Sequence, residues 1–260
     1  MKISVLGSGS SGNCVFLETG RTRVLVDAGF GIRSLRRRCR EAGISIEEFD
    51  AILVTHGHSD HIAGIPSLLK SSSAVLFMNE GTREEAYKLR GIERQELFCS
   101  GQPFSIGDLS VEAFPTPHDA AESVGFKFSA EGISGALATD LGEITPTVLK
   151  QLEQCDWLVL ESNHDEELLK VGPYPWDLKR RVLGPTGHLS NRALAEFISR
   201  DFDGRAAHLF LAHLSRKNND PELALASANT AVEQRPTTNG YHPLQVHLTY
   251  QNNPSIVLDL

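Results

Sequence analysis

One short segment limits what this chain can fold into more than any other. The apolar run Ala51–Thr55, rich in β-branched residues, is typical of a buried strand, and it leads directly into the sequence HGHSDH at positions 56–61. In an extended segment, residues two apart point to the same side, so His56 and His58 can bind one ion. Gly57 permits the chain to turn sharply behind them. The segment therefore predicts a metal site at the end of a buried strand.

The remaining polar residues of this segment extend the site. Ser59 and Asp60 begin a short helical segment, which would turn Asp60 and His61 towards a neighbouring position. Three imidazoles and a carboxylate within so few residues suit Zn²⁺ or another first-row ion. The alternative is a histidine-rich surface loop, which is the usual interpretation of a lone histidine. Three histidines and an aspartate after a buried strand favour the metal site.

Further ligands are needed, because six residues cannot complete two metal sites. Three candidates each follow an apolar strand: His118 after 109–114, Asp140 after 133–138, and His213 after 207–212. Each alone fits a surface or core residue equally well. Their shared position at strand ends, where a sheet edge gathers side chains from distant parts of the sequence, favours a common site.

Strands and helices alternate along the chain. The predicted strands are 2–6, 14–18, 23–26, 51–55, 74–78, 109–114, 124–129, 133–138, 157–161, 207–212 and 245–250, and the predicted helices are 32–42, 82–89, 190–200 and 221–232. A chain of 260 residues with 40% hydrophobic residues can bury a large core in one domain or two small ones. The alternation predicts an α/β fold of packed layers.

The composition limits the possible classes of function and indicates the cellular compartment. The net charge of −8 argues against a globally basic nucleic-acid-binding protein. Local basic clusters remain at 33–40, 179–181 and 216–217, and each also fits a solvated helix face. The four cysteines are scattered, and we find neither a signal peptide nor an apolar stretch of membrane-spanning length. We therefore expect a cytoplasmic protein without a membrane segment.

Several motifs resemble one known family. Residues 55–61 match the THxHxDH signature of the metallo-β-lactamase superfamily, and Asp27, His118, Asp140 and a late histidine follow in that family's order. Four motifs resemble its YycJ (WalJ) branch of exonucleases: GSGSSGN at 7–13, ESNHD at 161–165, GHLSN at 187–191 and HLSRKNN at 213–219. The resemblance covers nearly the whole chain. It implies a single domain over 1–260 with a four-layer αββα metallo-β-lactamase-like sandwich.

The resemblance also implies a ligand set for two divalent ions, zinc or manganese, with iron as an alternative. One ion would take His56, His58 and His118, and the other Asp60, His61 and His213. Asp140 and a hydroxide would bridge the two ions. Asp27 would orient a ligand or nearby backbone, although a simple turn aspartate explains it equally well.

Several residues are candidates for roles beyond metal binding. His213 directly follows a strand, so we prefer it to His188 as the ligand; His188 then contacts the substrate phosphate or protonates the leaving alkoxide. Asp60 is a second catalytic candidate, because its carboxylate can accept a hydrogen bond from the hydroxide. The candidate substrate contacts are Ser11, Asn13, His164, Arg216 and Lys217. For Ser11, Asn13 and His164 a purely structural role is an open alternative. His208, His242 and His247 are expected to be structural.

Three functions remain for such a site. The first is a phosphodiesterase, a 5′→3′ DNA exonuclease by resemblance, with nucleic acid as its partner. The second is a hydrolase of small esters or thioesters, similar to glyoxalase II or lactonases. The third is a di-iron redox or metal-binding protein, which His58 disfavours because redox members usually carry an acidic residue there. The motifs around His188 and His213 favour the nuclease. The oligomeric state stays open.

Overall fold

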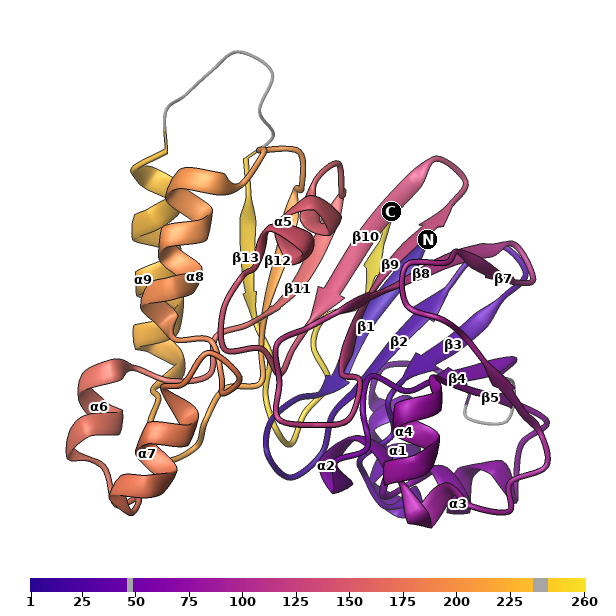
Figure 1. Ribbon diagram of the computed structural model, residues 1–260. Helices are drawn as coiled ribbons and strands as arrows, with labels where there is room; N and C mark the ends of the chain where they lie inside the picture. Colours follow the sequence, from indigo (N-terminus) through magenta and orange to yellow (C-terminus); the bar gives the residue numbers. More distant parts are fainter. Residues whose placement is uncertain (46–48, 236–242) are drawn as a thin grey trace. The chain divides into compact units, whose positions relative to one another are not determined.

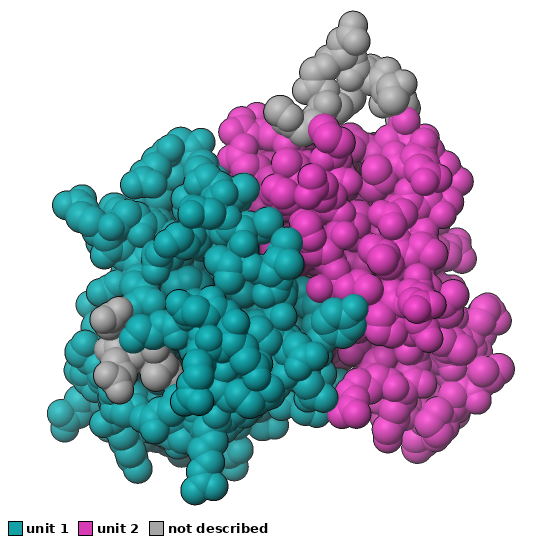
Figure 2. All heavy atoms as spheres, turned by 180° about the vertical axis from the view of Figure 1, so that it is seen from behind, with its two compact units in different colours: residues 1–115, 120–133, 249–260 teal, residues 116–119, 134–248 magenta. Residues whose placement is uncertain are grey.

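The chain divides into two compact units in a computed structural model, which describes residues 1–45, 49–235 and 243–260. Unit 1 contains residues 1–115, 120–133 and 249–260, and unit 2 contains residues 116–119 and 134–248 (Figure 2). The single domain over 1–260 stays a prediction. His242 lies outside the described residues.

Unit 1 is built on a mixed sheet with the strand order β14-β1-β2-β3-β4-β5-β6. The strands are β1 (Lys2–Gly7), β2 (Cys14–Glu18), β3 (Arg23–Val26), β4 (Ala51–Leu53), β5 (Val75–Met78), β6 (Gln95–Leu97) and β14 (Leu258–Asp259). β1, β2 and β3 are antiparallel, whereas β3 to β6 are parallel. The carboxyl ends of β3 and β4 therefore meet at one edge, where Asp27 and His56 follow them.

Helices and a second group of strands complete unit 1 (Figure 1). The helical segments are α1 (Ile32–Glu41), α2 (Ser59–Ile62), α3 (Ile65–Leu69), α4 (Glu80–Glu85) and the 3₁₀ turn η1 (Tyr87–Leu89). Three antiparallel strands follow: β7 (Phe104–Ile106), β8 (Leu109–Pro115) and β9 (Val124–Ala130). Leu35 and Cys39 of α1 pack into the same core as Phe16, Leu25 and Ile52 of the sheet. This core fixes the strand ends that carry the histidines.

Unit 2 contains parallel strands in the order β10-β11-β12-β13. They are β10 (Ile133–Ala138), β11 (Trp157–Glu161), β12 (His208–Ala212) and β13 (Gln245–Leu248). The helical segments are α5 (Pro146–Leu152), α6 (Glu166–Val171), α7 (Trp176–Val182), α8 (Asn191–Glu196), the π-helical turn η2 (Phe197–Asp201) and α9 (Pro221–Glu233). Helices α8 and α9 lie side by side (Figure 1). The parallel strands direct their carboxyl ends, and thus Asp140, Glu161 and His213, to one edge.

Most predicted elements are confirmed, and the differences are local. Every predicted strand is present, with ends that differ by at most about two residues. The predicted helix 82–89 is instead α4 followed by η1, and the predicted helix 190–200 is α8 followed by η2. The strands β6, β7 and β14 and the helices α3, α5, α6 and α7 are not among the predicted elements. Among the described residues, no helix is both long and apolar enough to cross a membrane.

Candidate metal centre

The first group of candidate ligands comes from the turn between β4 and α2. We call His56, His58, Asp60 and His61 the unit 1 cluster. The His56 ring lies 4.6 Å from the His58 ring and 4.1 Å from the His61 ring, measured between centroids. His56 and His61 are fully buried, and His58 and Asp60 are half-buried. The turn therefore brings together three imidazoles, as the sequence predicts.

Asp27 holds this cluster from the neighbouring strand end. Its Oδ1 accepts the backbone N–H of Thr55 at 2.9 Å, and its Oδ2 accepts the Thr55 hydroxyl at 2.9 Å. The same Oδ2 lies 2.8 Å from Nδ1 of His61. With Nδ1 directed at Asp27, the nitrogen of His61 that can bind an ion is Nε2, which lies 3.0 Å from Nδ2 of Asn13. Asp27 thus makes the contact expected of a residue that orients a ligand.

Backbone contacts fix the short helix α2 that carries Asp60 and His61. The carbonyl oxygen of His61 accepts the N–H of Ala28 at 2.8 Å, and that of Asp60 accepts the N–H of Asn13 at 2.8 Å. A Cβ atom on Gly29 would lie 1.6 Å from the Asp60 carbonyl oxygen. Only glycine fits there, so the segment after β3 depends on Gly29 to approach α2 closely.

The second group of candidate ligands belongs to unit 2. We call His118, Asp140, Glu161, His188 and His213 the unit 2 cluster. Oδ1 of Asp140 lies 3.3 Å from Nδ1 of His213, 3.7 Å from Nδ1 of His188 and 3.8 Å from Nε2 of His118. Asp140, Glu161, His188 and His213 each offer one ligand atom within 4.8 Å of the others. Residues far apart in the sequence thus converge, as their places at strand ends predict.

Glu161 is the member of this cluster that is not among the predicted site residues. Its side chain is fully buried, and its Oε1 lies 2.8 Å from Nδ1 of His188 and 2.8 Å from Nδ1 of His213. Its Oε2 accepts the backbone N–H of Leu141 at 3.0 Å and of Leu189 at 3.3 Å. Burial favours the protonated acid, but the two imidazoles outweigh it and hold the pKa of Glu161 well below its usual range. A glutamate that ends the apolar strand β11 is the signal that was available.

His188 lies in a loop and not at a strand end. The loop is tightly folded: the His188 N–H donates to the Val182 carbonyl oxygen at 3.0 Å, and a Cβ on Gly187 would lie 2.2 Å from the Arg181 carbonyl oxygen. Burial lowers the pKa of His188, whereas the charge and the hydrogen bond of Glu161 raise it. The effect of Glu161 is the larger, so the pKa of His188 lies above its usual value. His188 lies near the candidate ligand Asp140, and its role as proton donor stays a prediction.

Three of the candidate residues have an unusual backbone conformation. Asp27, Asp140 and His213 have φ angles of 60°, 56° and 56°, in the left-handed region. Few residues other than glycine adopt this region, because Cβ crowds the following carbonyl oxygen. Each of the three follows a strand, and such strain is tolerated where the surrounding structure fixes a functional side chain.

The predicted substrate contacts differ in accessibility. Arg216, Lys217 and Ser11 are exposed. Asn13 is buried, and its Oδ1 accepts from the Ser8 hydroxyl and the Gly9 N–H. His164 is 1% exposed, neither ring nitrogen has a hydrogen-bond partner among the described residues, and burial lowers its pKa to about 4. The substrate roles of all five residues stay predictions.

The side chains of both clusters fit divalent ions. Neutral imidazole nitrogens and ionised carboxylate oxygens are the ligands that zinc and similar first-row ions prefer. His61 and His213 both direct Nδ1 at a buried carboxylate, which is the usual arrangement for a histidine that binds metal through Nε2. The donor chemistry is therefore that of a metal centre.

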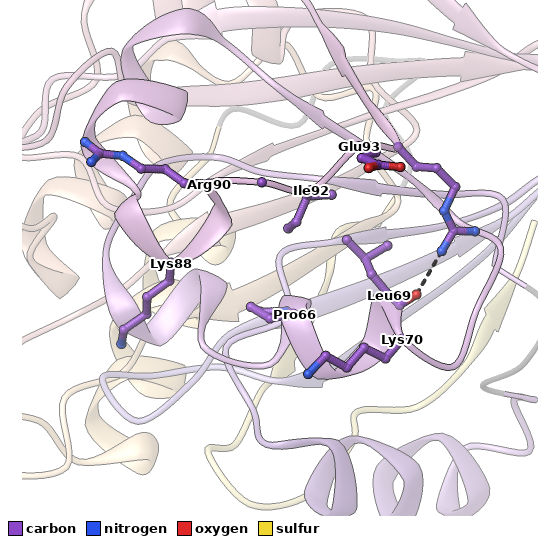
Figure 3. A pocket seen from close by; sticks show the side chains of 9 residues that line it. Pro66, Leu69, Lys70, Lys88, Arg90, Ile92 and Glu93 are labelled. Atoms are coloured by element: carbon purple, nitrogen blue, oxygen red, sulfur yellow. Dashed lines mark hydrogen bonds between the residues drawn. The ribbon is translucent and has the colours of Figure 1, made fainter.

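A basic pocket also occurs in unit 1. It is a cavity of about 440 Å³ lined by Pro66, Leu69, Lys70, Lys88, Arg90, Gly91, Ile92, Glu93 and Arg94 (Figure 3). The Arg94 guanidinium donates to the Leu69 carbonyl oxygen at 2.8 Å. None of the lining residues belongs to either cluster, so the pocket is not part of the candidate metal centre.

The chain is similar to known proteins of the β-lactamase superfamily. Residues 22–213 match the β-lactamase superfamily domain. The chain is 38% identical over 228 residues to exodeoxyribonuclease WalJ of Streptococcus pneumoniae serotype 2, covering 86% of this chain and 85% of WalJ. It is 35% identical over 238 residues to exodeoxyribonuclease YycJ of Bacillus anthracis, covering 90% of each.

The fold is also similar to that of a solved structure. The crystal structure of the metallo-β-lactamase fold protein YhfI from Bacillus subtilis matches with a TM-score of 0.73, covers 99% of each chain and is 17% identical. The predicted four-layer αββα metallo-β-lactamase-like fold class is therefore confirmed.

Proposed function

Because this chain belongs to the WalJ/YycJ family of the β-lactamase superfamily, we propose that it is a metal-dependent exonuclease that degrades DNA from the 5′ end. The alignments with the relatives named as exodeoxyribonucleases cover most of this chain and most of each relative. This coverage supports a shared activity. The cytoplasm, suggested by the scattered cysteines, is the proposed location.

We assign two divalent ions, zinc or manganese, to the ligand series that the family resemblance implies. By that series His56, His58 and His118 would hold one ion, Asp60, His61 and His213 would hold the other, and Asp140 would serve both. Bound ions of this kind lower the pKa of a coordinated water and offset the negative charge that develops on a phosphodiester. The donor chemistry of both clusters supports this assignment.

Asp27 and Glu161 orient the ligands in this proposal. Asp27 fixes the ring of His61, and Glu161 fixes the ring of His213, in each case through Nδ1. A histidine whose Nδ1–H is bound to a carboxylate keeps one tautomer and one orientation, so no rearrangement is needed when the ion binds.

The observation that carries the hydrolytic function is the sharing of Glu161 between two histidines. One oxygen of this carboxylate contacts both His213, an assigned ligand, and His188, which is not assigned to an ion. His188 is thereby kept beside the ligands, with its ring 21% exposed to solvent and its pKa raised. We assign it the transfer of a proton to the departing 3′ oxygen, a step that phosphodiester cleavage requires.

The second candidate function is hydrolysis of small thioesters or esters. The same ligand series would serve that reaction, because the ions polarise a carbonyl as readily as a phosphoryl group. The exposed Arg216 and Lys217, shortly after His213, favour a phosphate-bearing substrate.

End-labelled DNA duplexes test the proposal against this alternative. We expect a chelator to abolish cleavage, zinc or manganese to restore it, and a label at the 5′ end to be released at once as a short product. A label at the 3′ end should stay in long products until late. Hydrolysis of S-lactoylglutathione much faster than that of any oligonucleotide would refute the nuclease.

A further inference from the structure

Exposed apolar side chains, one of them a tryptophan, occur in the segment 166–183, which we call the α6–α7 arm. Three of its large apolar side chains face solvent: Val171 is 81% exposed, Trp176 is 62% exposed and Leu183 is 44% exposed. The other tryptophan of the chain, Trp157, is fully buried in β11. Tryptophan is highly buried on average, and apolar side chains that gather at the surface mark binding sites more often than single ones do.

The arm is rigid where the aromatic residues lie. Pro173 and Pro175 flank Tyr174 and restrict the backbone, and Pro175 directly precedes α7. The ammonium group of Lys179 donates to the Lys170 carbonyl oxygen at 2.6 Å, which ties α7 to α6. A preformed surface loses little conformational freedom when it binds a ligand.

The arm is attached to the segment that follows His213. A Cβ on Gly172 would lie 2.4 Å from Oδ1 of Asn218, so the chain between α6 and α7 is pressed against that segment. Nζ of Lys217 lies 5.6 Å from the centroid of the Tyr174 ring, within range of a cation–π contact. The other end of α7 leads into the loop of His188 through the hydrogen bond to Val182. The arm is thus connected to the unit 2 cluster at both ends.

Cations accompany the aromatic residues. Arg216 and Lys217 are exposed. Arg180 and Arg181 are also exposed, although they pair with Asp177 and Asp119. The printed ring–cation contact is that of Lys217 with Tyr174. A surface with both rings and cations suits single-stranded nucleic acid, because bases stack on rings while phosphates contact cations.

We propose that the α6–α7 arm stacks unpaired bases of the DNA strand, with Trp176 as the main stacking residue and Lys217 beside its phosphates. This inference rests on the proposed nuclease function and adds a substrate class to it: strand ends whose bases are unpaired, as in an overhang. Bases inside a duplex are covered by their neighbours and offer no face to a tryptophan.

Kinetics of Trp176→Ala test the inference. On an oligonucleotide with a single-stranded 5′ overhang, KM should rise roughly 5- to 100-fold, the effect of one lost base–aromatic stack, while kcat changes little. Trp176→Phe should recover most of the loss, because phenylalanine retains a flat ring. Bis(p-nitrophenyl) phosphate, which has no base, should show no comparable defect. An overhang of abasic nucleotides should reduce the wild type to the level of Trp176→Ala.

Tyr87→Ala is the matched control. Tyr87 of unit 1 is 67% exposed, and Nζ of the neighbouring Lys88 lies 6.0 Å from its ring centroid, so the variant removes a similar exposed ring beside a lysine. Its kinetics should equal those of the wild type. An equal defect in Tyr87→Ala, or unchanged KM in Trp176→Ala, would overturn the inference.

Binding separates this inference from the proposed function. Fluorescence anisotropy of a labelled single strand is measured on the Asp140→Ala background, which we expect not to cleave. Weaker binding when Trp176→Ala is added supports the arm as a DNA surface, and equal binding overturns it. If the wild type binds the strand through Trp176 but cleaves no DNA, the nuclease proposal fails and the stacking surface stands.

Discussion

The unit 1 and unit 2 clusters assemble similar donor atoms in different ways. In unit 1 the candidate ligands come from one turn, and one carboxylate, Asp27, orients one histidine, His61. In unit 2 they come from separate strand ends and a loop, and one carboxylate, Glu161, contacts two histidines. We therefore expect the unit 1 cluster to tolerate the loss of its orienting carboxylate better than the unit 2 cluster does.

The largest effect is expected from Asp140→Ala, which removes the ligand assigned to both ions. We expect the variant to lose most of both metals and to cleave DNA at least about a thousand-fold more slowly, because the ions supply several kcal/mol of charge stabilisation. Metal analysis and single-turnover cleavage measure this. Full metal content in Asp140→Ala would contradict the assignment of Asp140 to both ions. It would mean that each cluster binds metal without this residue.

His188→Ala should slow turnover roughly 10²–10⁴-fold, the usual consequence of a lost general acid. The loss should be much smaller on a substrate that releases nitrophenolate, since this leaving group departs without a proton. An equal loss on both substrates would show that His188 acts on substrate binding instead.

A pair of variants tests the comparison between the clusters directly. Glu161→Gln and Asp27→Asn each keep the shape of an orienting side chain but remove its charge. Loss of an orienting carboxylate typically weakens metal binding about 10–100-fold. We expect Glu161→Gln to lie at the upper end, because it disturbs two imidazoles, and Asp27→Asn at the lower end. Metal titration gives both affinities, and the reverse order would contradict our account of the shared carboxylate.

The difference between the clusters also explains what the sequence could predict. The unit 1 cluster was predictable because its candidate ligands are close together in the sequence and follow one apolar strand. His118, Asp140 and His213 were predictable from their strand ends, since parallel strands gather these at one edge. The place of Glu161 at that edge was equally available, because it ends the apolar strand β11, but its role comes from a pairing with His188 and His213 across distant segments. A single sequence does not reveal such a pairing.

Helices α6 and α7 were missed for a different reason. Both are short, and Pro173 and Pro175 lie between them, so the segment lacks the extended periodicity by which a helix is recognised. The exposed Trp176 would also be assigned to the core on composition alone. Surface function is therefore visible only when burial is known.

The smallest effects on DNA cleavage are expected from two arginine variants, one in each unit. Arg38 of α1 is 3% exposed, and its guanidinium donates to the carbonyl oxygens of Leu6 at 2.9 Å and Gln251 at 2.7 Å. Arg38→Ala should therefore destabilise the fold by about 2–4 kcal/mol without a specific effect on DNA binding. Arg216→Ala should leave the stability unchanged, weaken DNA binding a few-fold and reduce the salt slope by about one. Thermal unfolding and anisotropy at several salt concentrations give both results.

The most direct test of the metal assignment is the metal content of two histidine variants, measured by mass spectrometry of the purified protein. We expect two divalent ions per chain in the wild type and in His188→Ala, because His188 is not assigned to an ion. His213→Ala should contain less metal, since it loses a ligand. Loss of metal in His188→Ala together with full content in His213→Ala would mean that the two roles are exchanged and would contradict our account.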